Sequence, residues 1–303
     1  MATSDLLIEI GTEELPPKSL NSLSTAFEDL ISDALASQNI AFKETQRFAT
    51  PRRLAVIINQ VAESQSDVKL LRVGPAISAA YDGNGKATPA ALGFAKSCSV
   101  ELNELETITK NGVEKLSYEA LEKGKETSTL IPELIGSVLK KLPTPKRMRW
   151  GSSKEEFVRP LHSILLLFGE EQLEFRAFGV SSSNFTRGHR FHNNSEIVVS
   201  EPAQYENTLS DLGLVIPDFE KRKEMIRAQV LEQGELVNAV TTIDEELLEE
   251  VTSLVEYPTA LTGEFDREFL KVPSEALILT MKTHQTVSYT HLRANETRED
   301  RVC

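Results

Sequence analysis

The sequence predicts an α+β protein of about two domains, with mixed sheets and helices packed on them, and three observations support this. The chain has 303 residues, which at about 150 residues per domain favours two domains. Patterns of a strand, a helix and a second strand follow one another at the start of the chain. A hairpin pattern and then a long amphipathic helix complete the first half.

The N-terminal patterns give the first three elements. Residues 6–10 (LLIEI) are mostly apolar, which predicts a buried strand that ends at Gly11. Apolar residues then recur at spacings of three and four over residues 20–35, a pattern typical of an amphipathic helix. Residues 54–61 (LAVIINQV) are rich in β-branched residues, and we expect a second strand there.

The next two patterns predict a hairpin and a helix. Residues 106–121 are interrupted by Asn111-Gly112, a dipeptide that suits the two-residue type I′ turn of a β-hairpin. Residues 130–142 place their apolar side chains on one helical face, and Pro132 fits the first turn of this helix.

A pair of prolines marks the predicted domain boundary. Pro143 and Pro145 follow the helix and end it. We therefore predict an N-terminal α+β domain over residues 1–142 and a second α+β domain over residues 143–285.

The second half of the chain carries four further patterns. Residues 157–168 fit a helix and a strand equally well, whereas residues 175–180 predict a strand. Charged helices are predicted at residues 218–233, closed by a glycine, and at residues 244–257, where Asp244 is the expected N-cap.

The composition excludes several classes of protein. Lysine and arginine number 33 and aspartate and glutamate 46, which gives a net charge of −13. A general nucleic-acid coat needs a basic face against phosphate, so the overall acidity excludes that class but not a selective RNA partner. A hydrophobic content of 40% is ordinary for a globular protein and excludes disorder as the main state.

Neither a membrane span nor a secretory signal is predicted. The longest strongly apolar run, residues 164–168, is far shorter than the roughly 18 to 20 residues of a span. The N-terminus has no positive region followed by an apolar stretch. Cys98 and Cys303 are too few for a disulfide framework or a structural zinc site. We expect a cytoplasmic protein that contacts no membrane.

Charge is distributed unevenly along the chain. The segment from Lys140 to His192 contains ten basic and five acidic residues, a net charge of +5. The rest of the chain therefore carries −18. A basic segment inside an acidic protein is an asymmetry typical of an RNA contact.

Two motifs in this segment are the candidate RNA contacts. Residues 146–150 (KRMRW) combine cations that neutralise phosphate with a tryptophan that stacks on a base, and residues 186–191 (TRGHRF) place two arginines beside a glycine. The alternatives are a solvated basic loop with its tryptophan in the core, and a turn with exposed charge. A shorter motif of the same type is residues 50–53 (TPRR). The predicted RNA-binding residues are Lys146, Arg147, Arg149, Trp150, Arg159, Arg187, His189 and Arg190.

Motifs for catalysis or metal binding are not found in the sequence. Neither a P-loop nor a G-x-G-x-x-G pattern occurs. The spacing of His189 and His192 differs from that of a helical metal pair, and the adjacent Glu13 and Glu14 favour a loop feature over an acid/base pair. We therefore predict no catalytic residue and no metal ligand on this chain.

Seven stretches, in this order, resemble one family. They are residues 6–18 (LLIEIGTEELPPK), 48–56 (FATPRRLAV), 147–151 (RMRWG), 157–162 (FVRPLH), 186–191 (TRGHRF), 247–258 (LLEEVTSLVEYP) and 272–285 (VPSEALILTMKTHQ). Together they resemble the N-terminal part of the β subunit of bacterial heterotetrameric glycyl-tRNA synthetase, and the resemblance covers residues 4–285.

The resemblance implies a ligase that joins glycine to tRNA(Gly) with ATP. In that family the assembly is α₂β₂, the α subunit carries the adenylation site, and the β subunit mainly holds tRNA. The expected partners are thus the α subunit and tRNA(Gly), with no DNA. No cofactor is expected on this chain, and ATP with Mg²⁺ is used by the holoenzyme. The family's β subunit is longer, so the chain is predicted to be truncated before its HD-type and anticodon-binding regions.

The resemblance stops at Thr286. Residues 286–303 (TVSYTHLRANETREDRVC) have no apolar periodicity and replace the Lys-Tyr-Phe with which the family continues, so we predict a non-native tail. Two alternative functions for the chain are a free-standing RNA-binding or adaptor module and an editing-type hydrolase.

Overall fold

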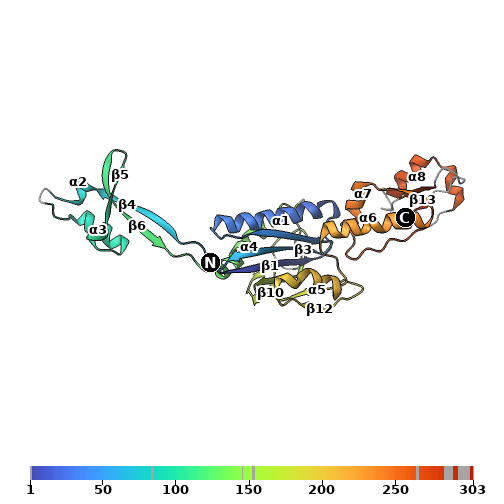
Figure 1. Cartoon of the computed structure of the whole chain (residues 1–303), viewed down its shortest axis with the longest axis horizontal. Coiled ribbons are helices and arrows are strands. Elements are labelled where there is room, and N and C mark those ends of the chain that lie inside the picture. The colour runs from blue at the N-terminus through green and yellow to red at the C-terminus, as the bar shows by residue number, and fades with distance from the viewer. Residues whose placement is uncertain are drawn as a thin grey trace. The chain divides into compact units, whose positions relative to one another are not determined.

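The computed structural model describes residues 2–82, 85–144, 146–151, 154–263, 266–282, 289–292 and 301–302. The chain forms two compact units (Figure 1). Unit 1 comprises residues 1–63 and 128–303, and unit 2 comprises residues 64–127. This division differs from the predicted boundary after residue 142, because unit 2 is inserted between two segments of unit 1.

Unit 1 contains the central sheet and most of the helices. Its elements are β1 (Thr3–Thr12), α1 (Pro17–Ser37), β2 (Glu44–Thr50), β3 (Arg53–Ala62), α4 (Thr127–Lys141), β7 (Leu161–Phe168), β8 (Glu171–Gln172), β9 (Arg176–Ala177), β10 (Val180–Ser183), β11 (Phe185–Arg187), β12 (Glu196–Val198), η2 (Pro202–Gln204), α5 (Tyr205–Asp211), α6 (Phe219–Leu236), β13 (Ala239–Thr242), α7 (Glu245–Thr252), η3 (Arg267–Lys271), α8 (Ser274–Thr280), β14 (Tyr289–Leu292) and β15 (Arg301–Val302).

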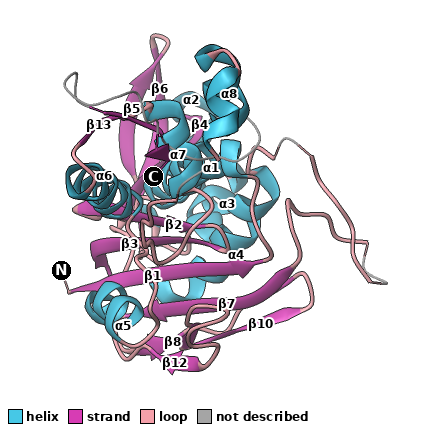
Figure 2. Cartoon of the chain, turned by 90° about the vertical axis from the view of Figure 1, so that its right-hand side faces the viewer, coloured by secondary structure: helices cyan, strands magenta, loops and turns pink. Residues whose placement is uncertain are grey.

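Seven of the described strands of unit 1 form a mixed sheet (Figure 2). Its order is β2-β3-β1-β7-β10-β9, and β8 pairs with β7. The pairs β2–β3, β3–β1 and β1–β7 are antiparallel, whereas β10 runs parallel to β7. The predicted α+β class is therefore confirmed.

The alternation of side chains along β1 divides the core between the two faces of the sheet. Leu6, Ile8 and Ile10 pack on one face against α1 and α4, whereas Leu7 packs on the other face against α5. Successive side chains of a strand point to opposite faces, so Glu9 lies on the same face as Leu7. Both faces are covered, and a carboxylate is thereby placed inside the apolar layer below α5.

The predicted elements of the first 62 residues are confirmed. The strands extend slightly beyond the predicted ranges, as β1 and β3. Helix α1 begins at Pro17, and proline is favoured in the first turn of a helix. The buried positions of α1 keep the predicted helical spacing. Those positions are Leu20, Leu23, Ser24, Phe27, Ile31 and Leu35.

Three predicted elements differ from the structure. Helix α4 begins at Thr127, so Pro132 lies inside it and not in its first turn. Residues 175–180 are not one strand, because Phe178 and Gly179 have positive φ angles of 53° and 82° and turn the chain between β9 and β10. Residues 157–168, which fitted two structures equally well, form strand β7 from Leu161 onward.

The two charged helices begin where the sequence predicts but end elsewhere. Asp218 caps α6, and the helix continues past Gly234 to Leu236. Asp244 is confirmed as the N-cap of α7, since its side chain accepts hydrogen bonds from the amides of Glu246 and Leu247. Helix α7 ends at Thr252, five residues before the predicted end.

Unit 2 is a small α+β unit. Its elements are β4 (Val68–Ala76), α2 (Ile77–Ala80), α3 (Pro89–Cys98), η1 (Leu102–Glu104), β5 (Glu106–Lys110) and β6 (Val113–Glu122). The sheet order is β4-β6-β5. The predicted hairpin is confirmed: Asn111 and Gly112 have φ angles of 55° and 74°, and two positive φ values are what a type I′ turn requires.

Within the described part of the chain, every helix is too short or too polar to cross a lipid bilayer. The predicted tail contains β14, which pairs with β13, and β15, which pairs with β14. Residues 286–288, 293–300 and 303 lie outside the described residues.

Candidate functional site

A cluster of buried polar side chains lies on the face of the central sheet that packs against α5. The Glu9 carboxylate, 1% exposed, accepts hydrogen bonds from the Thr186 hydroxyl at 2.7 and 2.9 Å and from the Tyr205 hydroxyl at 2.5 Å. A buried carboxylate without hydrogen-bond donors would be strongly unfavourable, and these two hydroxyls supply such donors. They come from β11 and α5, which therefore join β1 through polar contacts.

Arg53 connects this carboxylate to a second one. Its guanidinium lies 3.6 Å from Glu9 and 3.3 Å from Glu256. The same group donates to the Thr50 and Thr186 hydroxyls and to the Arg187 carbonyl, at 3.1, 3.2 and 2.9 Å. Thr50 in turn donates to Glu256 at 2.8 Å. We call Glu9, Thr50, Arg53, Thr186, Tyr205 and Glu256 the buried cluster.

The electrostatics of the buried cluster fix the charge of Arg53 and of Tyr205. Burial alone would lower the pKa of Arg53, but Glu256 and Glu9 outweigh it and raise that pKa. Burial, together with the Glu9 carboxylate, raises the pKa of Tyr205 well above its usual range. Arg53 is thus held as a cation, and Tyr205 keeps the proton that it donates to Glu9.

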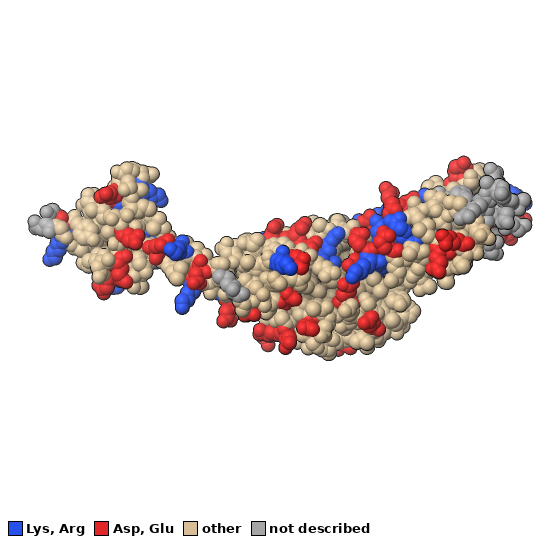
Figure 3. Space-filling model, in the orientation of Figure 1, with Lys and Arg blue, Asp and Glu red and all other residues tan. Residues whose placement is uncertain are grey.

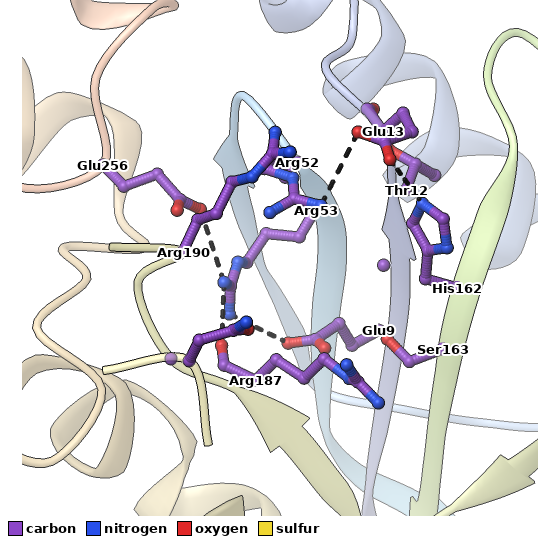
Figure 4. Close-up of a pocket in the computed structure, with 13 residues that line it drawn as sticks. Glu9, Thr12, Glu13, Arg52, Arg53, His162, Ser163, Arg187, Arg190 and Glu256 are labelled. Carbon is purple, nitrogen blue, oxygen red and sulfur yellow. Dashed lines mark hydrogen bonds and ion pairs between the residues drawn. The ribbon is translucent and has the colours of Figure 1, made fainter. Parts of the chain in front are cut away.

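A cavity of about 340 Å³ opens above the buried cluster (Figure 4). We call it the arginine pocket, and it is lined by Glu9, Gly11, Thr12, Glu13, Arg52, Arg53, His162, Ser163, Arg187, Gly188, Arg190, Asn194 and Glu256. Four arginines against three glutamates leave one net positive charge among these residues. The volume lies within the range typical of small-molecule sites.

A β-bulge shapes one wall of the arginine pocket. Gly11 pairs with Ser163, but Thr12 pairs with Leu161, so that β7 has one extra residue, His162, at this point. A bulge disturbs the alternation of side chains and often re-aims one beside a site. Adjacent residues His162 and Ser163 both line the cavity as a result.

Four partly exposed side chains form what we call the rim: Glu13, Arg52, His162 and Arg190. The Glu13 carboxylate is 2.9 Å from His162 Nε2 and 3.6 Å from Arg52 Nη2. Burial opposes ionisation of Glu13, but the hydrogen bond to His162 and the charges of Arg52 and Arg190 lower its pKa overall. Glu13 is therefore an anion at neutral pH.

The structure places seven of the eight predicted RNA-binding residues in two groups. In the first, Arg147 donates to the carbonyl of Lys140 at 2.7 Å and to the Thr144 hydroxyl at 3.1 Å, and Arg149 donates to Glu156 at 2.6 Å. These guanidiniums therefore stabilise their own loop.

Trp150 belongs to the same group. Its ring packs on that of Phe178, with centroids 6.0 Å apart, at the edge of the main core. This matches the alternative in which the tryptophan of the loop is a core residue.

The second group lies around the arginine pocket. Arg187 and Arg190 line it, and Lys146 and Arg159 line a neighbouring hollow that shares Glu13 with it. Arg159 also donates to the Glu14 carbonyl at 2.9 Å. Four of the eight predicted residues thus line two adjacent cavities that share Glu13.

His189 has a structural environment in the loop after β11. Burial is the main cause that lowers its pKa, so the ring is neutral at neutral pH. Its Nδ1 atom accepts from the amides of Phe191 and His192 at 3.2 and 3.3 Å. His189 thus holds the turn that presents Arg190.

Sequence reasoning did not select the remaining pocket residues. Arg52 lies in the shorter basic motif, residues 50–53, which contributes none of the predicted RNA-binding residues, and the sequence favours a loop role for Glu13. Glu9, His162 and Glu256 carry no local signal except that each lies in one of the family-like stretches. Five of those stretches, residues 6–18, 48–56, 157–162, 186–191 and 247–258, contribute lining residues to this one cavity.

Among the described residues, no group of three or more histidine, cysteine, aspartate or glutamate side chains is placed to hold a metal ion. On the face shown in Figure 3, acidic and basic side chains are interspersed.

The fold and the site define an α+β protein with an arginine-lined polar cavity at its central sheet. The family model described as glycyl-tRNA synthetase beta subunit matches residues 6–299. The chain belongs to this family.

Individual relatives agree with the family model. The chain is 46% identical over 286 residues to the glycine–tRNA ligase beta subunit of Marinobacter nauticus, which covers 94% of this chain and 41% of that protein. It is 45% identical to the beta subunit of Hahella chejuensis and 46% identical to that of Coxiella burnetii, each over 285 residues, with the same shares covered. The chain thus spans about two fifths of the length of the curated relatives that it matches.

Proposed function

We propose that this chain works as part of the β subunit of an enzyme that attaches glycine to tRNA(Gly). The proposal is supported by the family to which the chain belongs and by the names of its relatives, glycine–tRNA ligase beta subunit. The partner is a separate α subunit, in an α₂β₂ assembly in the cytoplasm. ATP with Mg²⁺ is used on the α subunit, where glycine is activated and then transferred to the tRNA 3′ end.

The role of this chain within that enzyme is to bind and position the tRNA. The observation that carries this role is the grouping of Arg187, Arg190, Lys146 and Arg159 around the arginine pocket and the hollow beside it. Positive side chains in and beside a cavity attract a polyanion and fix its position, even on a protein of net negative charge. The basic segment between residues 140 and 192 supplies all four.

Alanine substitution of Lys146, Arg159, Arg187 and Arg190 together tests this role in the assembled enzyme with the full-length β chain. We expect weaker tRNA binding and a flatter dependence of log Kd on log salt, because each lost phosphate contact lowers the slope by roughly 0.7 to 0.9. A matched control removes four exposed cations elsewhere: Lys43, Lys69, Arg72 and Lys271.

An unchanged salt slope in the variant without Lys146, Arg159, Arg187 and Arg190 would remove the tRNA-positioning role. Co-purification with a separate α subunit distinguishes a synthetase subunit from a free-standing RNA-binding module. A deacylation assay on mischarged tRNA tests the editing-type hydrolase.

A further inference from the structure

The arginines around the pocket differ in how fully their donors are used. Arg53 donates to hydroxyl, carbonyl and carboxylate oxygens at 2.9 to 3.3 Å, so its hydrogen bonds are satisfied inside the protein. Arg52 Nε is buried and has no hydrogen-bond partner, and the Glu13 oxygen that faces the other end of this guanidinium is 3.6 Å away. Buried polar atoms without partners are rare and mark places where a partner is missing.

Arg190 also lacks a close carboxylate partner, although it is more exposed than Arg52. Its Nη1 atom lies 3.8 Å from a Glu14 oxygen, beyond hydrogen-bond distance, and its side chain is 48% exposed. Arg52 and Arg190 lie between Glu13 and Glu256 in the view of Figure 4. Two guanidiniums whose carboxylate partners lie beyond hydrogen-bond distance therefore line one cavity.

The backbone that carries both arginines is constrained before any ligand arrives. On the Arg52 side, the carbonyls of Pro51 and Arg52 accept from the amides of Leu15 and Thr12 at 2.6 and 2.7 Å. On the Arg190 side, a Cβ added to Gly188 would lie 2.3 Å from the Asn193 carbonyl oxygen, so this loop closes tightly only around a glycine. Such preorganisation lowers the entropy lost on binding.

The glutamates of the pocket do not replace a ligand. Glu9 and Glu256 accept hydrogen bonds inside the buried cluster, and Glu13 accepts from His162. The planar fork of a guanidinium matches the oxygens of a phosphate or carboxylate in bidentate geometry. An oxyanion bound at Arg52 and Arg190 would accept hydrogen bonds from both guanidinium groups.

We infer that Arg52 and Arg190 in the arginine pocket bind one phosphate group. This inference rests on the proposed function for its preferred source, a phosphodiester of bound tRNA, because Lys146 and Arg159 continue the cationic lining into the neighbouring hollow on the far side of Glu13. A free phosphate or the phosphate of a small ligand has the same chemistry, and the experiment distinguishes these sources.

The test compares the wild type with Arg52→Ala/Arg190→Ala in the assembled enzyme. One arm measures tRNA affinity over a series of KCl concentrations. The other measures the rise in Tm caused by inorganic phosphate, relative to chloride at equal ionic strength. Lys69→Ala/Arg72→Ala is the control, since it removes two positive charges from exposed positions of β4.

If the pocket binds a phosphate of tRNA, Arg52→Ala/Arg190→Ala loses the rise in Tm caused by inorganic phosphate. The slope of log Kd against log salt for tRNA binding also decreases by roughly 0.7 to 0.9, the value for one phosphate contact. If the Tm response is lost but the slope is unchanged, the phosphate belongs to a small ligand. If neither measurement changes, or if the control changes both equally, the inference is overturned.

Two further comparisons keep the test decisive. If the alanine variant does not fold, Arg52→Lys/Arg190→Lys replaces it, because this variant keeps the two positive charges but loses the planar guanidinium groups. The inference then requires that the salt slope is retained and that the rise in Tm caused by phosphate is smaller than in the wild type. A rise in Tm as large as that of the wild type overturns the inference. If the wild type does not bind tRNA, the proposed function fails, while the phosphate arm still decides whether the pocket binds this anion.

Discussion

The buried cluster and the rim of the arginine pocket place the same residue types in opposite conditions. In the buried cluster, Arg53 is enclosed by the acceptors of four other side chains and one carbonyl. On the rim, Arg52 and Arg190 face carboxylates at 3.6 and 3.8 Å, and the buried Nε atom of Arg52 has no hydrogen-bond partner. The difference indicates that the charges of the buried cluster stabilise the fold, whereas the rim arginines are available to a ligand.

The largest effect is expected from Arg53→Met. The substitution leaves the carboxylates of Glu9 and Glu256 buried without their counter-charge, and breaking such a pair destabilises a protein by about 3 to 5 kcal/mol. Urea unfolding at neutral pH measures the loss. On the rim, Arg52→Met is expected to change the free energy of unfolding by less than about 1 kcal/mol. Equal losses for the two variants would contradict the comparison.

A smaller effect is expected from Tyr205→Phe, which removes one donor to Glu9. Loss of a hydrogen bond to a buried charged group destabilises by about 1.5 to 3 kcal/mol. Tyr257→Phe is the control, because Tyr257 is 43% exposed. Chemical unfolding of both variants at neutral pH gives the comparison, and a loss for Tyr205→Phe no larger than for the control would argue against the buried hydrogen bond.

The same variant has a pH signature. The pKa of Tyr205 is raised in the folded state, so its contribution to stability is full below the ordinary pKa of 10.0 and is lost as pH rises through the folded value. The difference in unfolding free energy between wild type and Tyr205→Phe is expected to be constant from pH 7 to about 9 and to shrink above about 10. A constant difference at every pH would exclude this linkage.

The smallest effect is expected from Glu13→Gln on the rim. The folded pKa of Glu13 is lowered, so its contribution is present above its ordinary pKa of 4.5 and is lost as pH falls through the folded value. Glu13 is 40% exposed, and solvent limits the contribution to under about 1 kcal/mol. Unfolding curves from pH 3 to 7, with exposed Glu44→Gln as control, measure it. A loss larger than that of Tyr205→Phe would reverse the order of buried cluster and rim.

Local patterns allowed the secondary structure of several segments to be predicted. The Asn111-Gly112 turn and the buried positions of α1 depend on residues that are close in sequence, and both agree with the structure. Helix ends were less accurate, because α6 continues past Gly234 and a glycine stops a helix only where the chain beyond it turns away. Such endings depend on tertiary contacts that periodicity does not contain.

The candidate site could be predicted only in part, for a similar reason. Thr50 and Glu256 are 206 positions apart, and their contact follows from the packing of the fold and not from any local pattern. The sequence located the basic segment, but Arg147 contacts a carbonyl of its own loop while Arg190 lines the pocket. Both are arginines in short basic motifs, and their surroundings in the fold give them different roles.

The ends of unit 2 give the protein a point of modular variation. Ser64 forms a bridge with Glu126, and the Gln65 amide donates to the Lys125 carbonyl at 2.9 Å, so the inserted segment departs and returns at one place. The entropy of closing a loop grows only slowly with its length once the ends are held together. A lineage can therefore enlarge, shorten or exchange this segment while the strands that carry the arginine pocket keep their register.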